Sequence, residues 1–249
     1  MSGHSKWAQI KRQKGVTDAR RGQLFTKLGR EIAVAARQGG GDPEANPRLR
    51  LAVDRARSFN MPNDTIERAI KRATGESGAS ELSEAIYEGY GPGGAAIMIE
   101  VLTDNRNRAV SDVRHALAKA GGNLGEAGCV AWIFESKGVI GIRMQGDAAE
   151  EVALQAIDAG AEDVKIDDDG LEIYTSPEDL ESVRRALEEA GGEIASAEVS
   201  RVPKSTISLD ERQAEQTLRL LDRLDELDDV QRVYSNGDFP DEVLAAYSR

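Results

Sequence analysis

The chain has 249 residues, with 32 Lys+Arg against 44 Asp+Glu and a formal net charge of −12. This length suits two or three domains, and 40% apolar with 31% charged residues is typical of a globular protein and excludes a disordered one. The single cysteine, Cys129, excludes an intramolecular disulfide and a multi-cysteine zinc site. No segment approaches the ~18 apolar residues of a membrane span, and "MSGHSKW" lacks the apolar run of a secretory signal, so we expect a cytoplasmic protein with no membrane partner.

Charge is divided unevenly along the chain. Residues 1–76 hold 16 Lys+Arg and 8 Asp+Glu, a net charge of +8, which leaves −20 for the remainder. Such a division predicts a basic module for a polyanion, attached to an acidic body that repels polyanions. The alternative is that the basic and acidic domains simply attract one another.

The first region predicts a small bundle of three helices. Apolar residues recur at helical spacing after Thr17 or Asp18 until the breaker at 39–41. Asn46-Pro47 supplies an N-cap and a first-turn proline for the second helix. A third helix is expected from residue 63 or 64 to about 75, with Asp64 and Glu67 at capping-box spacing.

Beyond residue 76 the apolar period changes to that of strands. A hairpin is expected around 91–94, then a helix over 107–120, and strands at "CVAWIFE" and "GVIGIRM". A helix over 148–159, two strands around 167–170, a helix over 177–190 and a strand over 194–202 follow. Residues 138–202 thus read β-α-β-β-α-β, the ferredoxin-like order, and a long helix and the strand "VQRVYS" come last.

The sequence offers no set of residues for catalysis. The two histidines, His4 and His115, lie far apart, and no His/Cys cluster has metal-ligand spacing. "GYGPGG" is not followed by Lys and Ser/Thr, so it is a hairpin turn and no P-loop. We therefore expect no enzyme, no cofactor, no metal and no small-molecule substrate. Beside these glycines, Tyr87, Glu88 and Tyr90 are candidates for a secondary contact surface.

Four stretches carry a resemblance to a known family. "MSGHSKWAQIKRQKGVTDARRGQLFTKLGREI", "NPRLRLAVDRARSFNMPNDTIERAIKRATG", "YEGYGPGGAAIMIE" and "NRNRAVSDVRHAL" resemble the YebC/PmpR family, and the match covers essentially the whole chain. In "GCVAWIF", Cys129 departs from the serine usual in that family.

The resemblance implies an α+β fold of three domains. A basic helical bundle (1–76) precedes an α/β domain (77–136 with 204–249), into which a ferredoxin-like α/β domain (137–203) is inserted. It also implies a regulator of gene expression. The family is assigned as DNA-binding transcriptional regulators, and its members are also described as translation factors that relieve ribosome stalling at proline runs.

Both roles predict that cations of the N-terminal region neutralise phosphates. His4 and Trp7 are predicted to stack on exposed bases, although packing into the bundle is the equal alternative for Trp7. Arg68, Lys71 and Arg72 either extend the basic patch or form a solvated helix face. The phosphate-binding candidates of the opening stretch are Lys6, Lys11, Arg12, Lys14, Arg20, Arg21, Lys27 and Arg30.

The nature of the nucleic acid stays open between DNA and ribosomal RNA. Gly15 and Gly22 interrupt the basic opening, which weakens a rigid recognition helix and favours structured RNA and hence the ribosome. The competing interpretation is a protein-interaction adaptor that acts through the acidic α/β domains.

Overall fold

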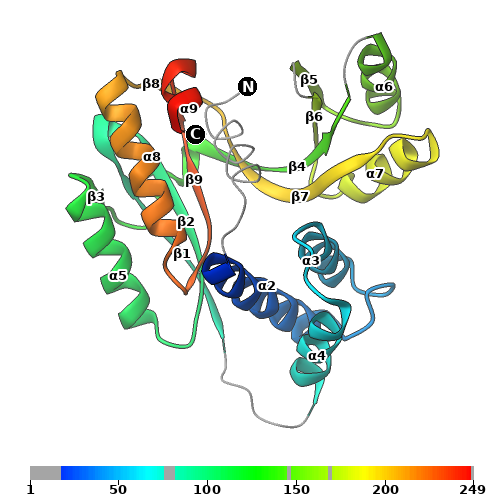
Figure 1. Ribbon diagram of the computed structural model, residues 1–249, viewed down its shortest axis with the longest axis horizontal. Helices are drawn as coiled ribbons and strands as arrows, with labels where there is room; N and C mark the ends of the chain where they lie inside the picture. Colours follow the sequence, from blue (N-terminus) through cyan, green and yellow to red (C-terminus); the bar gives the residue numbers. More distant parts are fainter. Residues whose placement is uncertain (1–17, 76–81, 145–146, 168–169, 248–249) are drawn as a thin grey trace.

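The computed structural model describes residues 18–75, 82–144, 147–167 and 170–247 (Figure 1). A helical bundle is followed by two α/β domains, each built on a four-stranded sheet. The expected α+β class is therefore confirmed. The bundle comprises α2 (Asp18–Gly39), α3 (Pro47–Ser58) and α4 (Asn63–Thr74), which share one apolar core.

Asn46 joins α2 to α3 and is 4% exposed. Its Oδ1 accepts a hydrogen bond from the Leu49 amide at 3.1 Å, which confirms the predicted N-cap of α3. Its Nδ2 donates to the carbonyls of Ala35 and Gly40, both at 2.9 Å. One side chain thus satisfies an amide of α3 and two carbonyls at the end of α2.

The N-cap of α4 differs from the expectation. Its N-cap is Pro62, which makes no side-chain capping bond, so the capping box expected from Asp64 and Glu67 is wrong. The helix begins at Asn63, one of the two expected starts, so Asp64 lies in its first turn. There a carboxylate interacts with the positive end of the helix dipole and does not cap.

The second domain is an antiparallel sheet in the order β3-β1-β2-β9, with α5 (Arg106–Lys119) and α8 (Glu211–Asp225) on one face (Figure 1). Its core holds Ile97 and Ile99 from β2 and Leu218 and Leu221 from α8. The expected hairpin between β1 and β2 is confirmed. The strands are β1 (Ser83–Tyr90), β2 (Ala96–Thr103), β3 (Asn123–Leu124) and β9 (Val230–Ser235). A short parallel pair, β8 (Ile207–Ser208) with β10 (Gly237–Asp238), and α9 (Asp241–Tyr247) complete it.

The third domain has the predicted order β-α-β-β-α-β. Its sheet order, β5-β6-β4-β7 with antiparallel neighbours, is ferredoxin-like. Two helices cover one face, and Ile140, Ile173, Leu180 and Leu187 are fully buried between the layers. The elements are β4 (Phe134–Ile142), α6 (Asp147–Asp158), β5 (Asp163–Asp167), β6 (Gly170–Thr175), α7 (Leu180–Glu189) and β7 (Ile194–Pro203).

The segment "CVAWIFE" is a strand only at its end. Ala131–Ile133 form a short 3₁₀ helix, and β4 begins at Phe134. The Glu88 carboxylate accepts hydrogen bonds from the amides of Gly128 (2.7 Å), Val130 and Ala131 (both 2.8 Å). These amides are bonded to a side chain and so do not pair with a neighbouring strand. The expectation of a strand over 129–133 is therefore wrong.

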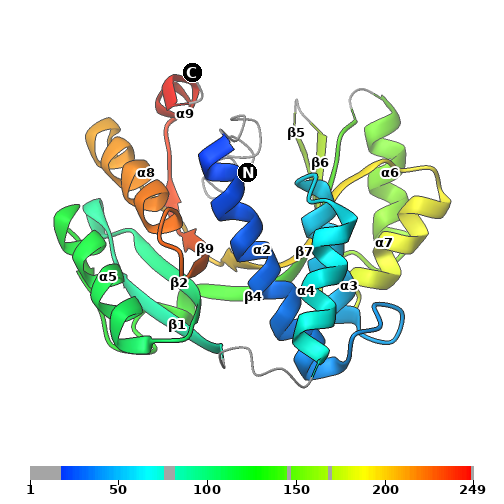
Figure 2. The same cartoon turned by 60° about the horizontal axis from the view of Figure 1, so that its bottom comes forward.

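β4 and β7 join the second and third domains. They are paired from Phe134 opposite Pro203 to Ile142 opposite Ile194. Phe134 packs in the second domain with Tyr234, whereas Ile142 lies in the third-domain core. The chain leaves the second domain on β4 and returns on β7, so the third domain is inserted in the second. In Figure 2 this two-stranded ribbon runs behind α2 from one α/β domain to the other.

Candidate nucleic-acid interface

α4 presents three basic side chains on the outside of the bundle. Ile66 is buried in the core and Ile70 packs against it, whereas Arg68, Lys71 and Arg72 are exposed. Spacings of three and four residues place the three cations on one side of the helix, opposite the isoleucines. We call Arg68, Lys71 and Arg72 the α4 basic row.

No acid of the described residues forms an ion pair with the α4 basic row. The Arg68 guanidinium donates to the Asp64 carbonyl at 3.0 Å and to the Thr65 hydroxyl at 3.1 Å, both on its own helix. Lys71 and Arg72 make no ion pair within the part of the chain that the structure describes. The row is therefore a local source of positive potential at the surface.

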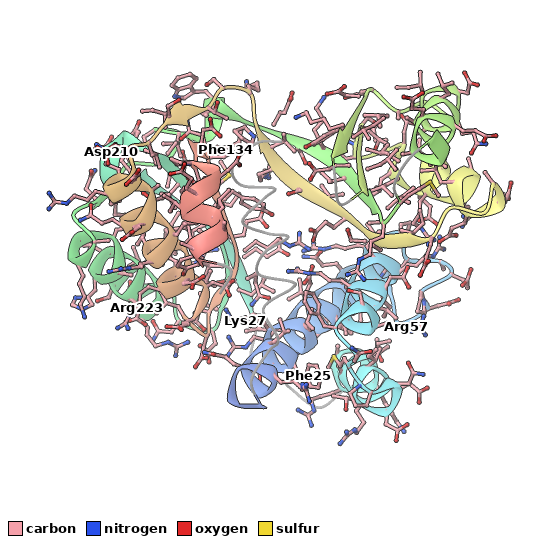
Figure 3. All side chains as sticks on the ribbon, turned by 45° about the horizontal axis from the view of Figure 1, so that its top comes forward. Phe25, Lys27, Arg57, Phe134, Asp210 and Arg223 are labelled. Carbon is pink, nitrogen blue, oxygen red and sulfur yellow. The ribbon has the colours of Figure 1, made fainter. Side chains whose placement is uncertain are left out.

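Two cations of α2 have a different environment. Lys27 is 7% exposed, and its Nζ donates to the main-chain carbonyl of Asp225 at the end of α8. Arg30 donates to the Asp228 carbonyl at 2.8 Å and to the Asp229 carboxylate at 3.1 Å. The last carbonyls of a helix lack intrahelical partners and carry the negative end of its dipole, so cations bind there. Figure 3 shows Lys27 on the side of α2 that faces the second domain and Phe25 toward α4.

Asp229 anchors the loop that follows α8. The residue is 6% exposed, and its carboxylate receives the guanidinium of Arg108, from α5, through contacts of 2.8 to 3.1 Å. The Thr103 hydroxyl donates to the same carboxylate at 3.1 Å. Arg30 thus binds a carboxylate that is already held rigidly by the second domain.

Six charged side chains meet where the three domains come together. The Glu31 carboxylate on α2 receives Nη1 of Arg55 and Nη2 of Arg232, each at 2.8 Å. Glu198 lies 3.8 Å from both arginines, and Glu100 accepts from Tyr234 at 3.2 Å and from Arg201 at 3.5 Å. The junction cluster, as we call it, comprises Glu31 and Arg55 of the bundle, Glu100 and Arg232 of the second domain, and Glu198 and Arg201 of β7. Its three acids balance its three arginines.

Glu31 and Arg232 of the junction cluster are both ionised at neutral pH. Burial alone raises the pKa of Glu31, but Arg55 and Arg232 outweigh burial and hold that pKa below its ordinary value of 4.5. Burial lowers the pKa of Arg232, yet Glu31 and the other anions keep it well above the ordinary range. The cluster is therefore a set of opposite charges that depend on one another.

Two further ion pairs hold the bundle in place. Arg50 of α3 lies 3.1 Å from Glu181 of α7, and Arg48 pairs with Glu84 of β1. Several basic residues of the bundle therefore bind the two acidic domains, as the alternative explanation of the charge division anticipates. They are Lys27, Arg30, Arg48, Arg50 and Arg55.

Comparisons with known proteins agree with this architecture. Residues 5–76 match the family model of the TACO1/YebC N-terminal domain, and residues 82–237 match that of the TACO1/YebC second and third domains. The chain belongs to the TACO1/YebC family. Relatives named probable transcriptional regulatory proteins include one from Dehalococcoides mccartyi, 57% identical over 99% of this chain and 98% of its own. Another, from Pelotomaculum thermopropionicum, is 55% identical over 97% of this chain and 100% of its own.

A solved structure has the same fold as this TACO1/YebC chain. The crystal structure of a conserved hypothetical protein from Aquifex aeolicus superposes with a TM-score of 0.82 and is 49% identical. The match covers 90% of this chain and 92% of the Aquifex chain. The arrangement of helical bundle and α/β domains is therefore shared with an experimentally determined relative.

The structure separates the predicted phosphate-binding residues of this TACO1/YebC chain into groups. It brings Arg68, Lys71 and Arg72 together on α4, and it places Lys27 and Arg30 against the second domain. Arg20 lies in the first turn of α2, and Arg21 beside it is exposed. Six predicted residues lie outside the described residues, namely His4, Lys6, Trp7, Lys11, Arg12 and Lys14.

Of the predicted secondary contact surface, Glu88 is buried, whereas Tyr87 and Tyr90 are half-buried. Glu88 is 7% exposed, and both its carboxylate oxygens hold the 128–131 loop, so Glu88 has a structural role in place of the predicted one. The Tyr90 hydroxyl donates to the Cys129 carbonyl at 3.0 Å, and the Tyr87 hydroxyl to the Arg106 carbonyl at 3.3 Å. All three side chains bind the protein's own main chain.

Sequence reasoning missed the junction cluster. Glu31 and Arg232 are 201 residues apart, so no local spacing relates them. One signal was present, since the strand period of "VQRVYS" places Arg232 and Tyr234 on the same face of β9. Glu100 stands directly opposite Arg232 in the sheet, but that register becomes visible only in the structure.

Two other kinds of site are absent from the described residues. No group of three or more His, Cys, Asp or Glu side chains among them is placed to hold a metal ion. No helix in the described ranges combines the length and apolar character needed to cross a membrane.

Proposed function

We propose that this chain is a non-enzymatic, nucleic-acid-binding regulator of gene expression. Its N-terminal segment and the α4 basic row contact the phosphate backbone, and the two α/β domains hold the bundle that presents them. The relatives' name, probable transcriptional regulatory protein, agrees with a regulatory role. The charge of residues 1–76, +8 against −20 for the remainder, supplies the electrostatic reason.

One observation carries the proposal. Basic residues of the bundle that face the acidic domains are paired with them, whereas the α4 basic row has no acidic partner among the described residues. If attraction between the domains were the only use of positive charge, exposed cations on the outward face of α4 would have no function. Cations that remain exposed and unpaired are those that can release counterions from a nucleic acid.

Within this proposal we favour structured RNA, and hence a role at the ribosome. Gly22 is exposed in the second turn of α2, and a methyl group there would meet no atom within 4 Å. A glycine inside a helix costs about 0.5–1 kcal/mol relative to alanine, and the fold gives no packing reason for it. A bare backbone at this position lets an irregular polyanion approach closely. We expect Gly22→Ala to stabilise α2 and to weaken RNA binding.

The test replaces the α4 basic row and measures binding over a range of salt concentrations. The variant carries Arg68→Gln, Lys71→Gln and Arg72→Gln, and the probes are a fluorescent RNA hairpin and a random-sequence DNA duplex. Loss of three phosphate contacts should reduce the slope of log affinity against log salt by about 2–3. The matched control neutralises three exposed arginines of α8 with the same charge change, namely Arg212, Arg219 and Arg223.

The outcomes separate the alternatives. Equal losses in the α4 and α8 variants would show that only net charge matters and would contradict the proposed site. Binding of neither probe by the unmodified chain would contradict the proposed function. Binding of one duplex sequence about 10³-fold or more above random DNA would establish promoter recognition in place of RNA. Under the ribosomal form, deletion of the gene should impair synthesis of proteins with proline runs.

A further inference from the structure

The third domain exposes apolar side chains at one edge. Of the large hydrophobic residues that are strongly exposed in the described ranges, three lie here: Leu154 (68% exposed), Ile157 (48%) and Ile166 (49%). Leu154 and Ile157 are three residues apart on α6 and so share one flank of that helix. Ile166 belongs to β5, against which α6 packs. We call these three residues the α6–β5 apolar edge.

β5 is an edge strand with an unused side. It pairs only with β6, and no other strand of the described residues lies beside it. The Val164 amide donates only to the side chain of the adjacent Asp163, at 2.9 Å, a local hydrogen bond that an added strand would have to replace. Ile166 stands opposite Leu171, which is buried beneath the helices, so Ile166 points to the helix side of the sheet. The free edge therefore offers main-chain hydrogen-bonding groups beside exposed apolar side chains.

The surroundings of this edge are acidic. Residues 149–166 hold five acids, all exposed, and one lysine, a net charge of −4. Glu162 pairs with Lys137, but Glu150, Glu151 and Asp158 make no ion pair with any residue that the structure describes. The single lysine, Lys165, lies 4.7 Å from the centre of the Tyr174 ring. Unpaired acids beside apolar groups favour a partner that is both basic and apolar.

We propose that the α6–β5 apolar edge is a docking site for an extended basic segment of another protein. The segment adds to β5 as a fifth strand, with main-chain hydrogen bonds to the free edge. Its apolar side chains, at alternate positions, cover Ile166 and the flank of α6, while its lysines or arginines face the acids. This site is separate from the proposed nucleic-acid surface.

A second copy of this chain is the less favoured occupant. Pairing two β5 strands would bring two surfaces of net charge −4 together, and each whole chain carries −12. Like charges that face one another across a pair of strands are destabilising. The acids thus discourage self-association at an edge that hydrophobicity alone would make adhesive.

The test measures binding of a fluorescently labelled nonapeptide of alternating lysine and valine, KVKVKVKVK, to the full chain by fluorescence anisotropy. Leu154→Gln with Ile157→Gln should weaken binding about tenfold or more, because buried apolar area is lost while charge is unchanged. Ile86→Gln is the matched control, since Ile86 lies in the second domain and is exposed to a similar extent (47%). This variant should bind the peptide as tightly as the unmodified chain does. Peptide binding should also slow hydrogen exchange of the amides of residues 163–167.

A peptide with proline in place of the valine at its fourth position separates strand addition from charge attraction, since proline cannot donate to the ladder. It should bind at least several-fold more weakly. The proposal is overturned if the proline peptide or the double variant binds as tightly as its reference, or if an alternating Glu/Val peptide binds equally well. It is also overturned if no saturable binding occurs up to millimolar peptide, or if sedimentation shows that two chains associate through this edge.

Discussion

Glu31→Gln removes one negative charge from the junction cluster with little change of shape. Each Glu31 oxygen accepts a hydrogen bond from a guanidinium at 2.8 Å, one from Arg55 and one from Arg232. A glutamine keeps one acceptor oxygen, while its amide group turns N–H bonds toward the second guanidinium. The cluster is left with three arginines and two acids.

The size of the effect follows from burial. Hydrogen bonds to charged groups contribute about 1.5–3 kcal/mol each, with the larger values at buried sites. Glu31, Arg55 and Arg232 keep about a fifth of their side-chain surface exposed, so solvent weakens but does not abolish the interaction. We expect Glu31→Gln to lower the free energy of unfolding by about 2–4 kcal/mol at pH 7.

Urea unfolding followed by circular dichroism measures this loss. With a slope of about 2–3 kcal/mol per molar urea, the midpoint should fall by about 1 M. Glu67→Gln is the control, because Glu67 is exposed on α4 and has no ion pair with a described residue, and its midpoint should not move. If the two variants differ by less than about 0.5 kcal/mol, the junction cluster does not hold the domains together.

The stability difference between the unmodified chain and Glu31→Gln should also depend on pH. The pKa of Glu31 in the folded chain lies below its ordinary value of 4.5. Its stabilisation is therefore fully present above pH 4.5 and is lost as the pH falls through the lower, folded-state pKa. Protonated glutamate resembles glutamine, so the difference between the unmodified chain and Glu31→Gln should shrink in that window. A difference that stays constant down to pH 3 would contradict the assigned charge interaction.

Three further predictions concern single positions. Glu88→Gln should lower the free energy of unfolding, measured by thermal unfolding, by about 2–4 kcal/mol, because a single amide oxygen cannot accept all three main-chain hydrogen bonds. Glu126→Gln, on the exposed loop nearby, is the control and should leave the melting temperature unchanged. Gly122→Ala should lower the melting temperature, since the added Cβ would lie 2.2 Å from the Tyr90 carbonyl oxygen, and an unchanged value would contradict this close approach. Although burial raises the pKa of Glu181, three arginines of α3 and α7 lower it to about 2, so its carboxyl carbon should titrate near pH 2 by NMR and not above 4.

Local patterns predicted the helices well because their apolar spacing is set by the core that each helix faces. The helix expected over 107–120 is observed at Arg106–Lys119, and the β-α-β-β-α-β order of the third domain is confirmed. The prediction of a strand over residues 129–133 was wrong for a non-local reason. Its apolar residues suit a strand, but Glu88, some 40 residues earlier, binds the amides that a strand would use.

The candidate site shows the same limit. Lys27 and Lys71 are equivalent as sequence, since each is a lysine on an amphipathic helix of a basic region. The structure distinguishes them through Asp225, which lies 198 residues beyond Lys27 and accepts its hydrogen bond. Which cations are free for a partner is decided by tertiary contacts. The sequence could therefore predict that the bundle is basic, but not which of its residues are bound within the chain.

The pairing of Phe134 with Pro203 has an evolutionary consequence. Residues that face each other across an antiparallel ladder have Cα atoms about 4.5–5.5 Å apart, so the chain departs from the second domain and re-enters it at nearly the same point. The 68 residues between them form, for the host domain, a single closed loop. The entropy of closing a loop grows only slowly with its length. Sequence at this place can therefore be gained, exchanged or shortened over generations while the host sheet and its helices keep their positions.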